Sequence, residues 1–275
     1  MGGDLFDRFA DWTAEADEAL GYSIRALCLE DPHGWLGLTT WTQPALFVVN
    51  AMTWRARQED GAGPPAFVAG HSLGEYNALL AAGAFDFAEG VRLVRRRGEL
   101  MGAVGGGGMA AVIGLEPARI EAILAASDAG RRLDVANFNS FDQTVIAGPK
   151  ADIEAVKLDV EGAGARAVIP LNVSAPFHSR YMRDAAAEFA GFLATRSFRP
   201  PAIPVIANVT GRPYDEADVA ATLATQIGHS VRWLDSMVYL MDQGVDTFEE
   251  VGPGSVLKKL IAQIRKRRPN RSATG

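Results

Sequence analysis

Hydrophobic residues recur three and four positions apart over several long stretches of the chain, which is the spacing of one face of a helix. This pattern predicts helices over 4–30, 42–59 and 87–104. In the second of these, Thr42 is the expected N-cap, and Pro44 is expected in the first turn, where its missing N–H breaks no helical hydrogen bond. The first part of the chain is therefore predicted to be mainly helical.

Short apolar runs follow a different pattern and predict buried strands. Three such runs, at 66–70, 204–210 and 246–252, each precede a helix-like segment. Strands that alternate with helices indicate a mostly parallel sheet covered on both faces.

The segment from 105 to 173 differs from its surroundings. It opens with four glycines at 105–108, which lack the Lys-Ser/Thr ending of a phosphate-binding loop and are interpreted as a flexible hinge. Six stretches then follow in the order strand, helix, strand, strand, helix, strand, which is typical of a ferredoxin-like unit. They cover 109–115, 117–127, 133–140, 143–149, 150–164 and 165–173.

Together these patterns predict an α/β fold, with an α/β-hydrolase-like large subdomain on a parallel sheet and an inserted ferredoxin-like small subdomain. The large subdomain is expected to be discontinuous and to cover 1–104 and 174–265, with the insertion at 105–173. A basic tail at 266–275 is interpreted as a solvated end rather than a docking patch.

Ser72 lies in the sequence Gly-His-Ser-Leu-Gly at 70–74, between a predicted strand and a helix-like segment. A serine at such a strand-to-helix turn is presented as a nucleophile. The turn also brings backbone N–H groups, notably that of Leu73, near a developing oxyanion. The alternative is that the glycines only permit a tight turn.

A nucleophilic serine needs a base, and four histidines compete for that role. His71 adjoins the serine, so its side chain should point away across the turn, while His33 lies in a loop-like stretch and His229 near a helix end. His178 follows the return from the predicted insertion to the large subdomain, and domain junctions are favoured positions for active sites. The pattern leaves His178 as either the base or a structural histidine.

Arg97 is the last of three consecutive arginines on a predicted helix. Because successive helical residues lie about 100° apart around the axis, at least one of the three can point inward. A buried guanidinium can hold a carboxylate with two hydrogen bonds. The alternative is that all three lie on a solvated face.

Composition narrows the classes of function. The chain has 275 residues and a formal net charge of −6, which argues against a general nucleic-acid binder. Its single cysteine, Cys28, excludes an internal disulfide. The histidines show no metal-site spacing, so no metal is expected. Without a signal-peptide pattern or an apolar run of about 18 residues, we expect a soluble cytoplasmic protein.

Seven motifs occur in order along the chain and carry a resemblance to a known family. Together they resemble the malonyl-CoA:acyl carrier protein transacylases, and most of all the free-standing acyltransferases that load polyketide synthases. The resemblance covers about 70–265 and, more loosely, the chain from Gly2. The motifs are GHSLGEYNALLAAG, RRRGELM, GGGMAAVIGL, ANFNSFDQTVIAG, NVSAPFHSRYM, PVIANVTGRP and VGPGSVLKKL.

The resemblance implies roles for individual residues. Ser72 matches the nucleophile that becomes the acyl-enzyme, His178 its general base and later acid, and Arg97 the arginine that binds the free carboxylate of malonyl. Gln226 matches a glutamine whose backbone carbonyl orients the histidine, which implies a Ser–His dyad with a neutral orienter. Phe177 resembles the malonyl-selective pattern, because a ring beside the acyl pocket leaves no room for an α-methyl group. It can pack in the core at the same time.

The sequence departs from the family at its start. The family begins with a buried strand and a loop ending in Gly-x-Gly-Ser-Gln, whose last N–H is a second oxyanion donor. This chain begins with Met-Gly-Gly-Asp-Leu, which resembles the segment after that loop. We expect a misplaced start or a trimmed chain rather than a natural loss of this donor, which is worth ~100- to 1000-fold in rate.

The resemblance implies transfer of a malonyl group from malonyl-CoA, through a Ser72 acyl-enzyme, to the phosphopantetheine thiol of an acyl carrier protein. The implied pathway is polyketide biosynthesis, with fatty acid biosynthesis left open. No cofactor is implied, nucleic acid and membranes are not expected partners, and a monomer is expected. One alternative is an acyl hydrolase that clears carrier proteins, against which Arg97 counts. The other is a catalytically silent docking partner of carrier proteins.

Overall fold

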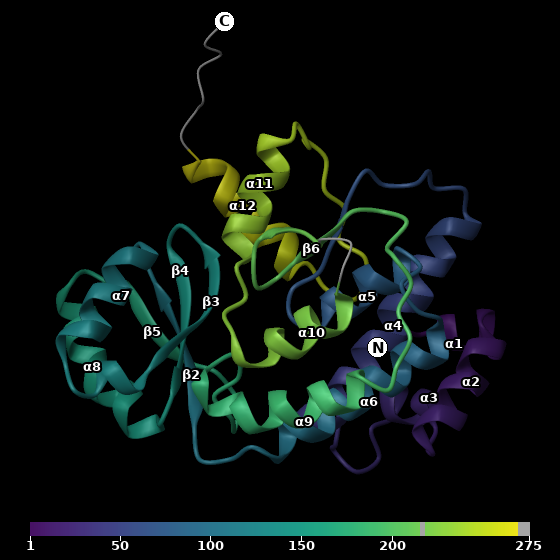
Figure 1. Cartoon of the computed structure of the whole chain (residues 1–275), viewed down its shortest axis with the longest axis horizontal. Coiled ribbons are helices and arrows are strands. Elements are labelled where there is room, and N and C mark those ends of the chain that lie inside the picture. Colours follow the sequence, from purple (N-terminus) through teal and green to yellow (C-terminus); the bar gives the residue numbers. More distant parts are fainter. Residues whose placement is uncertain (215–217, 269–275) are drawn as a thin grey trace, which may run out of the picture.

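The computed structural model describes residues 1–214 and 218–268, so most of the predicted basic tail, 269–275, lies outside the described residues. The chain forms a mixed α/β fold with two sheets, one of three strands and one of four. Figure 1 shows the four-stranded sheet with its helices on one side, the N-terminal helices on the other, and β6 between them. No helix within the described ranges is long and apolar enough to cross a membrane.

The predicted helical stretch at 4–30 is three helices: α1 (Leu5–Arg8), α2 (Ala10–Leu20) and α3 (Ile24–Leu29). The first break falls at Phe9, whose ring is buried, and the second at Gly21. Gly21 ends α2 with a φ of 78°, a left-handed conformation that glycine adopts without strain. Periodicity alone could not locate these breaks, because the apolar spacing continues across both.

Helix α4 (Thr39–Glu59) begins three residues before its predicted start, so the expectations for Thr42 and Pro44 were wrong. Pro44 lies inside the helix, beyond its first turn, and Thr42 Oγ1 donates to the carbonyls of Leu36 and Leu38. The start is set by the preceding loop, where the Asp31 carboxylate accepts the N–H groups of two loop residues, Trp35 and Leu36.

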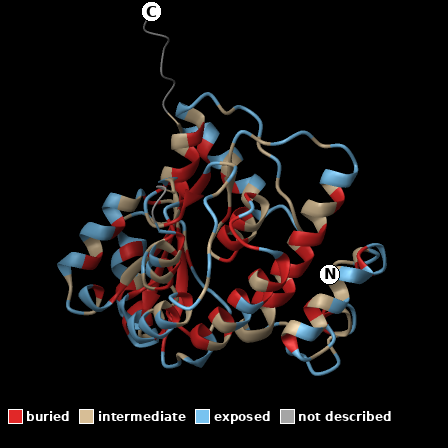
Figure 2. Cartoon of the chain, turned by 45° about the vertical axis from the view of Figure 1, so that its right-hand side comes forward, coloured by how far each residue is buried: buried red, intermediate tan, exposed pale blue. Residues whose placement is uncertain are grey.

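The three-stranded sheet has the order β1 (Val68–Ala69), β6 (Val205–Ala207) and β7 (Arg212–Pro213). Only the β1–β6 pair is parallel, and β7 is antiparallel, so the prediction of a mostly parallel sheet was wrong for the described strands. Helices α5 (Gly74–Ala81), α6 (Phe87–Ala103), α9 (Arg183–Leu193) and α10 (Val219–Gly228) surround it. Their apolar residues share one core with α4, and Figure 2 shows buried positions gathered on the inner faces of these elements.

The segment 246–252 is not a strand, contrary to prediction. It leads irregularly into α12 (Val256–Arg267), and the Glu250 carboxylate accepts hydrogen bonds from the N–H groups of Leu257 and Lys258 at 3.0 and 2.9 Å. The segment therefore caps a helix instead of pairing with a sheet. Helix α12 also includes the first two residues of the predicted tail.

The four-stranded antiparallel sheet has the order β3-β4-β2-β5. Its strands are β2 (Gly108–Ile113), β3 (Asp134–Ser140), β4 (Gln143–Gly148) and β5 (Ala167–Pro170). Helices α7 (Pro117–Ala126) and α8 (Lys150–Gly162) cover one face, and two short 3-10 turns, η1 (Gly130–Arg132) and η2 (Arg180–Met182), lie beside it. The opposite face packs against Val173 and Phe177, which brings the segment before His178 onto the sheet.

The strand-like segment around Val231 follows α10, precedes α11 (Trp233–Asp242) and contacts both sheets. The N–H of Arg232 donates to the carbonyl of Asn208, directly after β6, at 2.9 Å. Val231 forms a parallel bridge to Asn137 of β3. Its N–H donates to the Ala136 carbonyl at 2.8 Å and its carbonyl accepts from the Phe138 N–H at 2.9 Å. The end of α10 is thereby fixed against the four-stranded sheet.

Candidate active site

The serine turn connects β1 to α5, and its tightness explains its glycines. A Cβ at position 70 would meet the carbonyl carbon and oxygen of Gly74 at 1.9 Å, so only glycine fits there. Ser72 has a φ of 51°, in the left-handed region. Asn208 holds this strained turn from both sides: its Oδ1 accepts the Ser72 N–H at 2.6 Å, and its Nδ2 donates to the Gly70 carbonyl at 2.7 Å.

The Ser72 hydroxyl lies against His178. Ser72 Oγ and His178 Nε2 are 2.7 Å apart, and His178 Nδ1 lies 2.9 Å from the backbone carbonyl of Gln226. A carbonyl only accepts, so Nδ1 must carry the proton, which leaves the Nε2 lone pair free to accept from the serine hydroxyl. Burial, reinforced by the Arg97 cation, lowers the pKa of His178 to about 3. The imidazole is therefore neutral at physiological pH and able to take a proton.

Arg97 projects from α6 into the site and is 1% exposed. Its Nη2 donates to Ser72 Oγ at 3.0 Å and to Gln226 Oε1 at 2.9 Å, and its Nη1 donates to Gln43 Oε1 at 2.6 Å. Burial lowers the pKa of this guanidinium. Across 1–214 and 218–268, no carboxylate forms an ion pair with it, so a buried cation faces the serine with neutral partners only.

The two arginines beside Arg97 lie on the outside of α6. Arg95 pairs with Glu99, and Arg96 pairs with Glu99 and Glu188. Only the third arginine of the run is buried, which decides the question that the sequence left open.

The remaining predicted residues are Leu73, Gln226 and Phe177. Within the described ranges, no group accepts a hydrogen bond from the Leu73 N–H, which lies at the start of α5. Gln226 is fully buried at the end of α10 and contributes its backbone carbonyl to His178 and its side chain to Arg97. Phe177 is half-buried between the large core and the inner face of the four-stranded sheet.

The other histidines take no part in this arrangement. His71 Nε2 lies 2.9 Å from Asn139 Oδ1, so its ring points away from the serine. His33 packs on Trp35, and His229 Nδ1 lies 2.8 Å from the Thr225 carbonyl.

Sequence reasoning missed three residues of the site: Gln43, Glu75 and Asn208. Gln43 is a buried side chain of α4 that contacts Arg97, and Asn208 follows β6 directly. Glu75 is fully buried and accepts from Gln226 Nε2. The only sequence signal for these residues was a polar side chain at a position where the apolar spacing predicts a buried one. Gln43, on the apolar face of α4, is an example.

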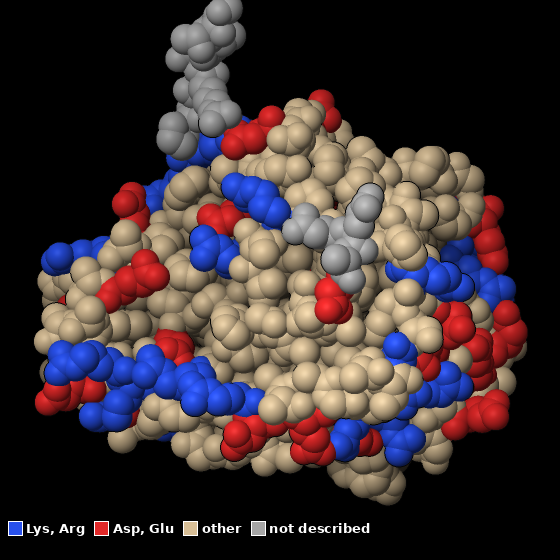
Figure 3. All heavy atoms as spheres, viewed as in Figure 1, with Lys and Arg blue, Asp and Glu red and all other residues tan. Residues whose placement is uncertain are grey.

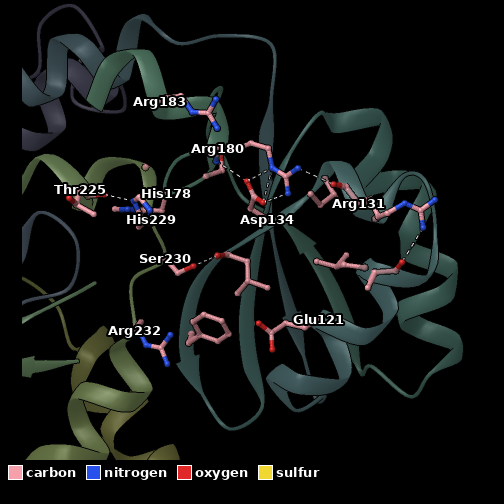
Figure 4. Close-up of a pocket in the computed structure, with 18 of the residues that line it drawn as sticks. Glu121, Arg131, Asp134, His178, Arg180, Arg183, Thr225, His229, Ser230 and Arg232 are labelled. Carbon is pink, nitrogen blue, oxygen red and sulfur yellow. Dashed lines mark hydrogen bonds and ion pairs between the residues drawn. The ribbon is translucent and has the colours of Figure 1, made fainter. Parts of the chain in front are cut away.

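A cleft of about 700 Å³ leads from the protein surface to His178. Figure 4 shows His178 and His229 on one wall and Asp134 and Arg131, from the side of the four-stranded sheet, opposite. Its lining includes the four arginines Arg131, Arg180, Arg183 and Arg232. Three of these arginines pair with aspartates, which are Asp128, Asp134 and Asp235, whereas Arg183 forms no ion pair among the described residues.

The site holds a serine hydroxyl that is hydrogen-bonded to a neutral histidine, with a buried cation beside it. On a mixed α/β fold, this arrangement is that of a serine-dependent acyl-transfer enzyme. A family profile described as an acyl transferase domain matches residues 1–274. The chain belongs to the malonyl-CoA:acyl carrier protein transacylase family of acyltransferases.

Two curated relatives of similar length are the polyketide biosynthesis malonyl CoA-acyl carrier protein transacylases BaeC of Bacillus velezensis and PksC of Bacillus subtilis. Each is 52% identical to this chain. The match covers 96% of this chain for BaeC and 97% for PksC, and 92% of each relative. The polyketide biosynthesis protein ThaF of Burkholderia thailandensis is 54% identical over 96% of this chain, which spans only 23% of that longer protein.

Solved structures agree with this assignment. The malonyl CoA-acyl carrier protein transacylase of Burkholderia pseudomallei superposes with a TM-score of 0.93 at 47% identity, covering 98% of this chain and 94% of that one. A second structure, a malonyl-transacylase in complex with a type II polyketide synthase acyl-carrier protein, gives a TM-score of 0.91 at 37% identity, covering 97% and 88%. Of the fold predicted from the sequence, these comparisons confirm the coarser part, a fold that mixes helices and sheets.

Proposed function

We propose that this protein transfers a malonyl group from malonyl-CoA, through an ester on Ser72, to the phosphopantetheine thiol of an acyl carrier protein in polyketide biosynthesis. The observation that carries the proposal is Arg97, a buried cation whose Nη2 lies 3.0 Å from Ser72 Oγ and which has no carboxylate partner among the described residues. A dicarboxylic half-thioester such as malonyl-CoA brings the missing carboxylate to the reacting serine. The names of the relatives BaeC and PksC point the same way.

In the first half-reaction, the carboxylate of malonyl-CoA pairs with Arg97, which exchanges its neutral partners for a charged one. His178 Nε2 takes the proton of Ser72 as Oγ bonds to the thioester carbonyl carbon. The Leu73 N–H donates to the resulting oxyanion. As the intermediate collapses, the carbon–sulfur bond breaks and the proton on His178 passes to the coenzyme A thiolate.

In the second half-reaction, the carrier protein thiol enters by the same cleft. His178 takes its proton, the sulfur bonds to the ester carbonyl carbon, and the Ser72 oxygen leaves with the proton that His178 returns. Malonyl is now a thioester on the carrier protein and the serine is regenerated, so the kinetics are ping-pong. The two bonds from Arg97 to the acyl carboxylate also keep the ester carbonyl away from an activated water, which favours transfer over hydrolysis.

The charge of the cleft supports both proposed substrates. Of the four arginines that line it, Arg183 alone has no ion pair among the described residues, so it is the best placed to meet a phosphate. Coenzyme A and phosphopantetheine both carry phosphate. Figure 3 shows a band of basic side chains crossing the lower left of the face seen in Figure 1, where the four-stranded sheet meets the start of α9. An acidic carrier protein would be attracted to this band.

We also infer a finer description of the architecture. The four-stranded sheet has the strand order second, third, first, fourth within its own β-α-β-β-α-β segment, which supports a ferredoxin-like insertion at 105–173. The serine turn between β1 and α5 supports an α/β-hydrolase-like large subdomain. The monomeric state, and the absence of nucleic acid and membranes as partners, stay predictions.

Incubation with malonyl-CoA labelled in the malonyl group tests the proposed function. A label that is retained on wild-type protein, absent from Ser72→Ala and transferred to an added acyl carrier protein is the expected result. Rapid release of free malonate would identify an acyl hydrolase instead. Failure of any labelling would contradict the proposal and favour a silent docking partner of carrier proteins.

A further inference from the structure

Glu75 is a buried acid that the transfer mechanism above does not use. It lies in the first turn of α5, three residues after Ser72, and its side chain is fully inaccessible to solvent. Three donors meet its carboxyl group: the Tyr214 hydroxyl at 2.5 Å and the Asn208 N–H at 3.3 Å on Oε1, and Gln226 Nε2 at 2.6 Å on Oε2. No cation in the described ranges forms an ion pair with it.

Two of these donors come from residues that shape the active site. The Asn208 side chain accepts from the Ser72 N–H and donates to the Gly70 carbonyl, which stabilises the serine turn. Gln226 also donates to the Ser72 carbonyl at 2.8 Å, accepts from Arg97, and orients His178 with its backbone carbonyl. Glu75 therefore lies one contact away from the nucleophile, the base and the proposed carboxylate-binding cation.

The chemistry of Gln226 gives Glu75 a directional role. A side-chain amide has a donating and an accepting end, and an ionised carboxylate only accepts. With a carboxylate at position 75, the NH₂ of Gln226 must face Glu75, so its Oε1 must face the Arg97 guanidinium. The Ser72 carbonyl, which only accepts, and the Arg97 guanidinium, which only donates, favour the same orientation. A neutral group at position 75 that can also donate would oppose this orientation and weaken the hold on the amide.

Charge adds to this directional effect. The titratable and charged groups around Glu75 are Tyr76 on its own helix, Arg97 on α6 and Tyr214 after β7. Burial raises the pKa of Glu75 to about 7, although Tyr214, Gln226, the Asn208 N–H and Arg97 all oppose the rise. Glu75 and Arg97 attract each other without direct contact, so the ionised carboxylate offsets part of the buried positive charge.

We propose that Glu75 is a positioning residue for acyl transfer, whose ionised carboxylate orients the Gln226 amide and so sets the geometry of Ser72, His178 and Arg97. The identity of the acyl group handled at this site rests on the proposed function, but the positioning role does not. The ionised form is the active one, so serine acylation should increase as the pH rises through the pKa of Glu75.

The test uses Glu75→Gln, which keeps the size but adds a donor, and Glu75→Asp, which keeps the charge. Asp86→Asn is the matched control, because Asp86 is also an acid at a helix start, accepting from the Glu89 N–H at 2.8 Å, but lies on the surface. Two rates are measured from pH 5.5 to 9 on protein shown to be folded by circular dichroism: single-turnover malonylation of Ser72, and labelling of Ser72 by a fluorophosphonate.

Glu75→Gln should lower both rates about 10- to 100-fold, as expected for a displaced catalytic group. It should also remove the increase of both rates with pH near neutrality. Glu75→Asp should restore part of the rate, and Asp86→Asn should behave like wild type. Tyr214→Phe removes one hydrogen-bond donor to Glu75, which should raise the pKa of Glu75 further. The increase of both rates with pH should therefore occur at higher pH. This variant keeps the test decisive if Glu75→Gln does not fold.

Wild-type rates and an unchanged pH profile in Glu75→Gln would overturn the positioning role, and so would an unshifted profile in Tyr214→Phe. The fluorophosphonate separates the two proposals, because it reports the reactivity of Ser72 whatever the natural acyl group is. Wild-type protein that reacts with the fluorophosphonate but not with malonyl-CoA would refute the proposed function and leave the positioning role testable.

Discussion

Ser72 and His178, whose Oγ and Nε2 lie 2.7 Å apart, both have left-handed backbone conformations, with φ of 51° and 56°. Only one other non-glycine residue in the described ranges, Asp31, has a positive φ. Such conformations cost ~1–3 kcal/mol each and persist where the surrounding structure enforces them. Here Asn208 holds the serine turn, and the Gln226 carbonyl holds the histidine ring. These two backbone conformations bring the Ser72 and His178 side chains into contact.

This strain predicts a difference between two inactive variants. Ser72→Gly and Ser72→Ala both lack the hydroxyl and should both fail to form an acyl-enzyme. Because glycine tolerates a φ of 51°, Ser72→Gly should be more stable than Ser72→Ala by about 1 kcal/mol. Thermal and urea unfolding of the two proteins measures the difference, and equal stability would argue against strain at this position.

Removal of the buried cation should change the acyl preference. Arg97→Ala is expected to lower malonylation of Ser72 at least 100-fold relative to acetylation, because a charge-assisted pair to the acyl carboxylate is lost. Competition between malonyl-CoA and acetyl-CoA measures the ratio. The neighbouring Arg96→Ala is the control, since Arg96 pairs with Glu99 on the surface. If Arg97→Ala kept the wild-type ratio of malonylation to acetylation, Arg97 would not be the residue that binds the carboxylate.

The depressed pKa of His178, about 3, has a consequence for stability. The unfolded chain takes up a proton at this histidine below pH ~6.5, while the folded protein does not, so folding stability falls as the pH drops below that value. The free energy of unfolding should therefore decrease between pH 6.5 and 5 by about 2 kcal/mol more in wild type than in His178→Gln. The difference between the two proteins cancels the contribution of Glu75. Parallel curves would contradict a neutral buried His178.

Phe177 should restrict the acyl group. Its ring precedes the base and packs between the large core and the four-stranded sheet. Phe177→Val is expected to raise the rate with methylmalonyl-CoA relative to malonyl-CoA by ~10- to 200-fold, the discrimination that one methylene provides. Rates with both substrates, together with the melting temperature, distinguish a change of acyl selectivity from a loss of packing. A constant ratio would leave Phe177 with a packing role alone.

Local patterns predicted most of the elements but not their ends or their partners. The helix expected at 87–104 is α6 (Phe87–Ala103), because its apolar stripe and its N-cap Asp86 are local signals. The strand expected at 246–252 was wrong, because an apolar run also suits an irregular segment that caps α12 through Glu250. The relative direction of paired strands could not be predicted from local patterns either, because pairing joins residues as distant in the sequence as Val68 and Val205.

The serine turn could be predicted from local sequence alone, because Gly70 and Ser72 stand between a short apolar run and a helix-like segment, and the ordered motifs indicated the family. Which arginine faces the serine and which histidine lies against it became clear only in the folded protein. The tertiary structure also brought Gln43, Glu75 and Asn208 to that point from α4, α5 and the end of β6. The physical reason is distance along the chain: Ser72 and His178 are 106 positions apart, and Gln226 lies 154 positions beyond Ser72. Only packing of the helices against the two sheets makes these buried polar groups neighbours, and burial then sets their pKa values.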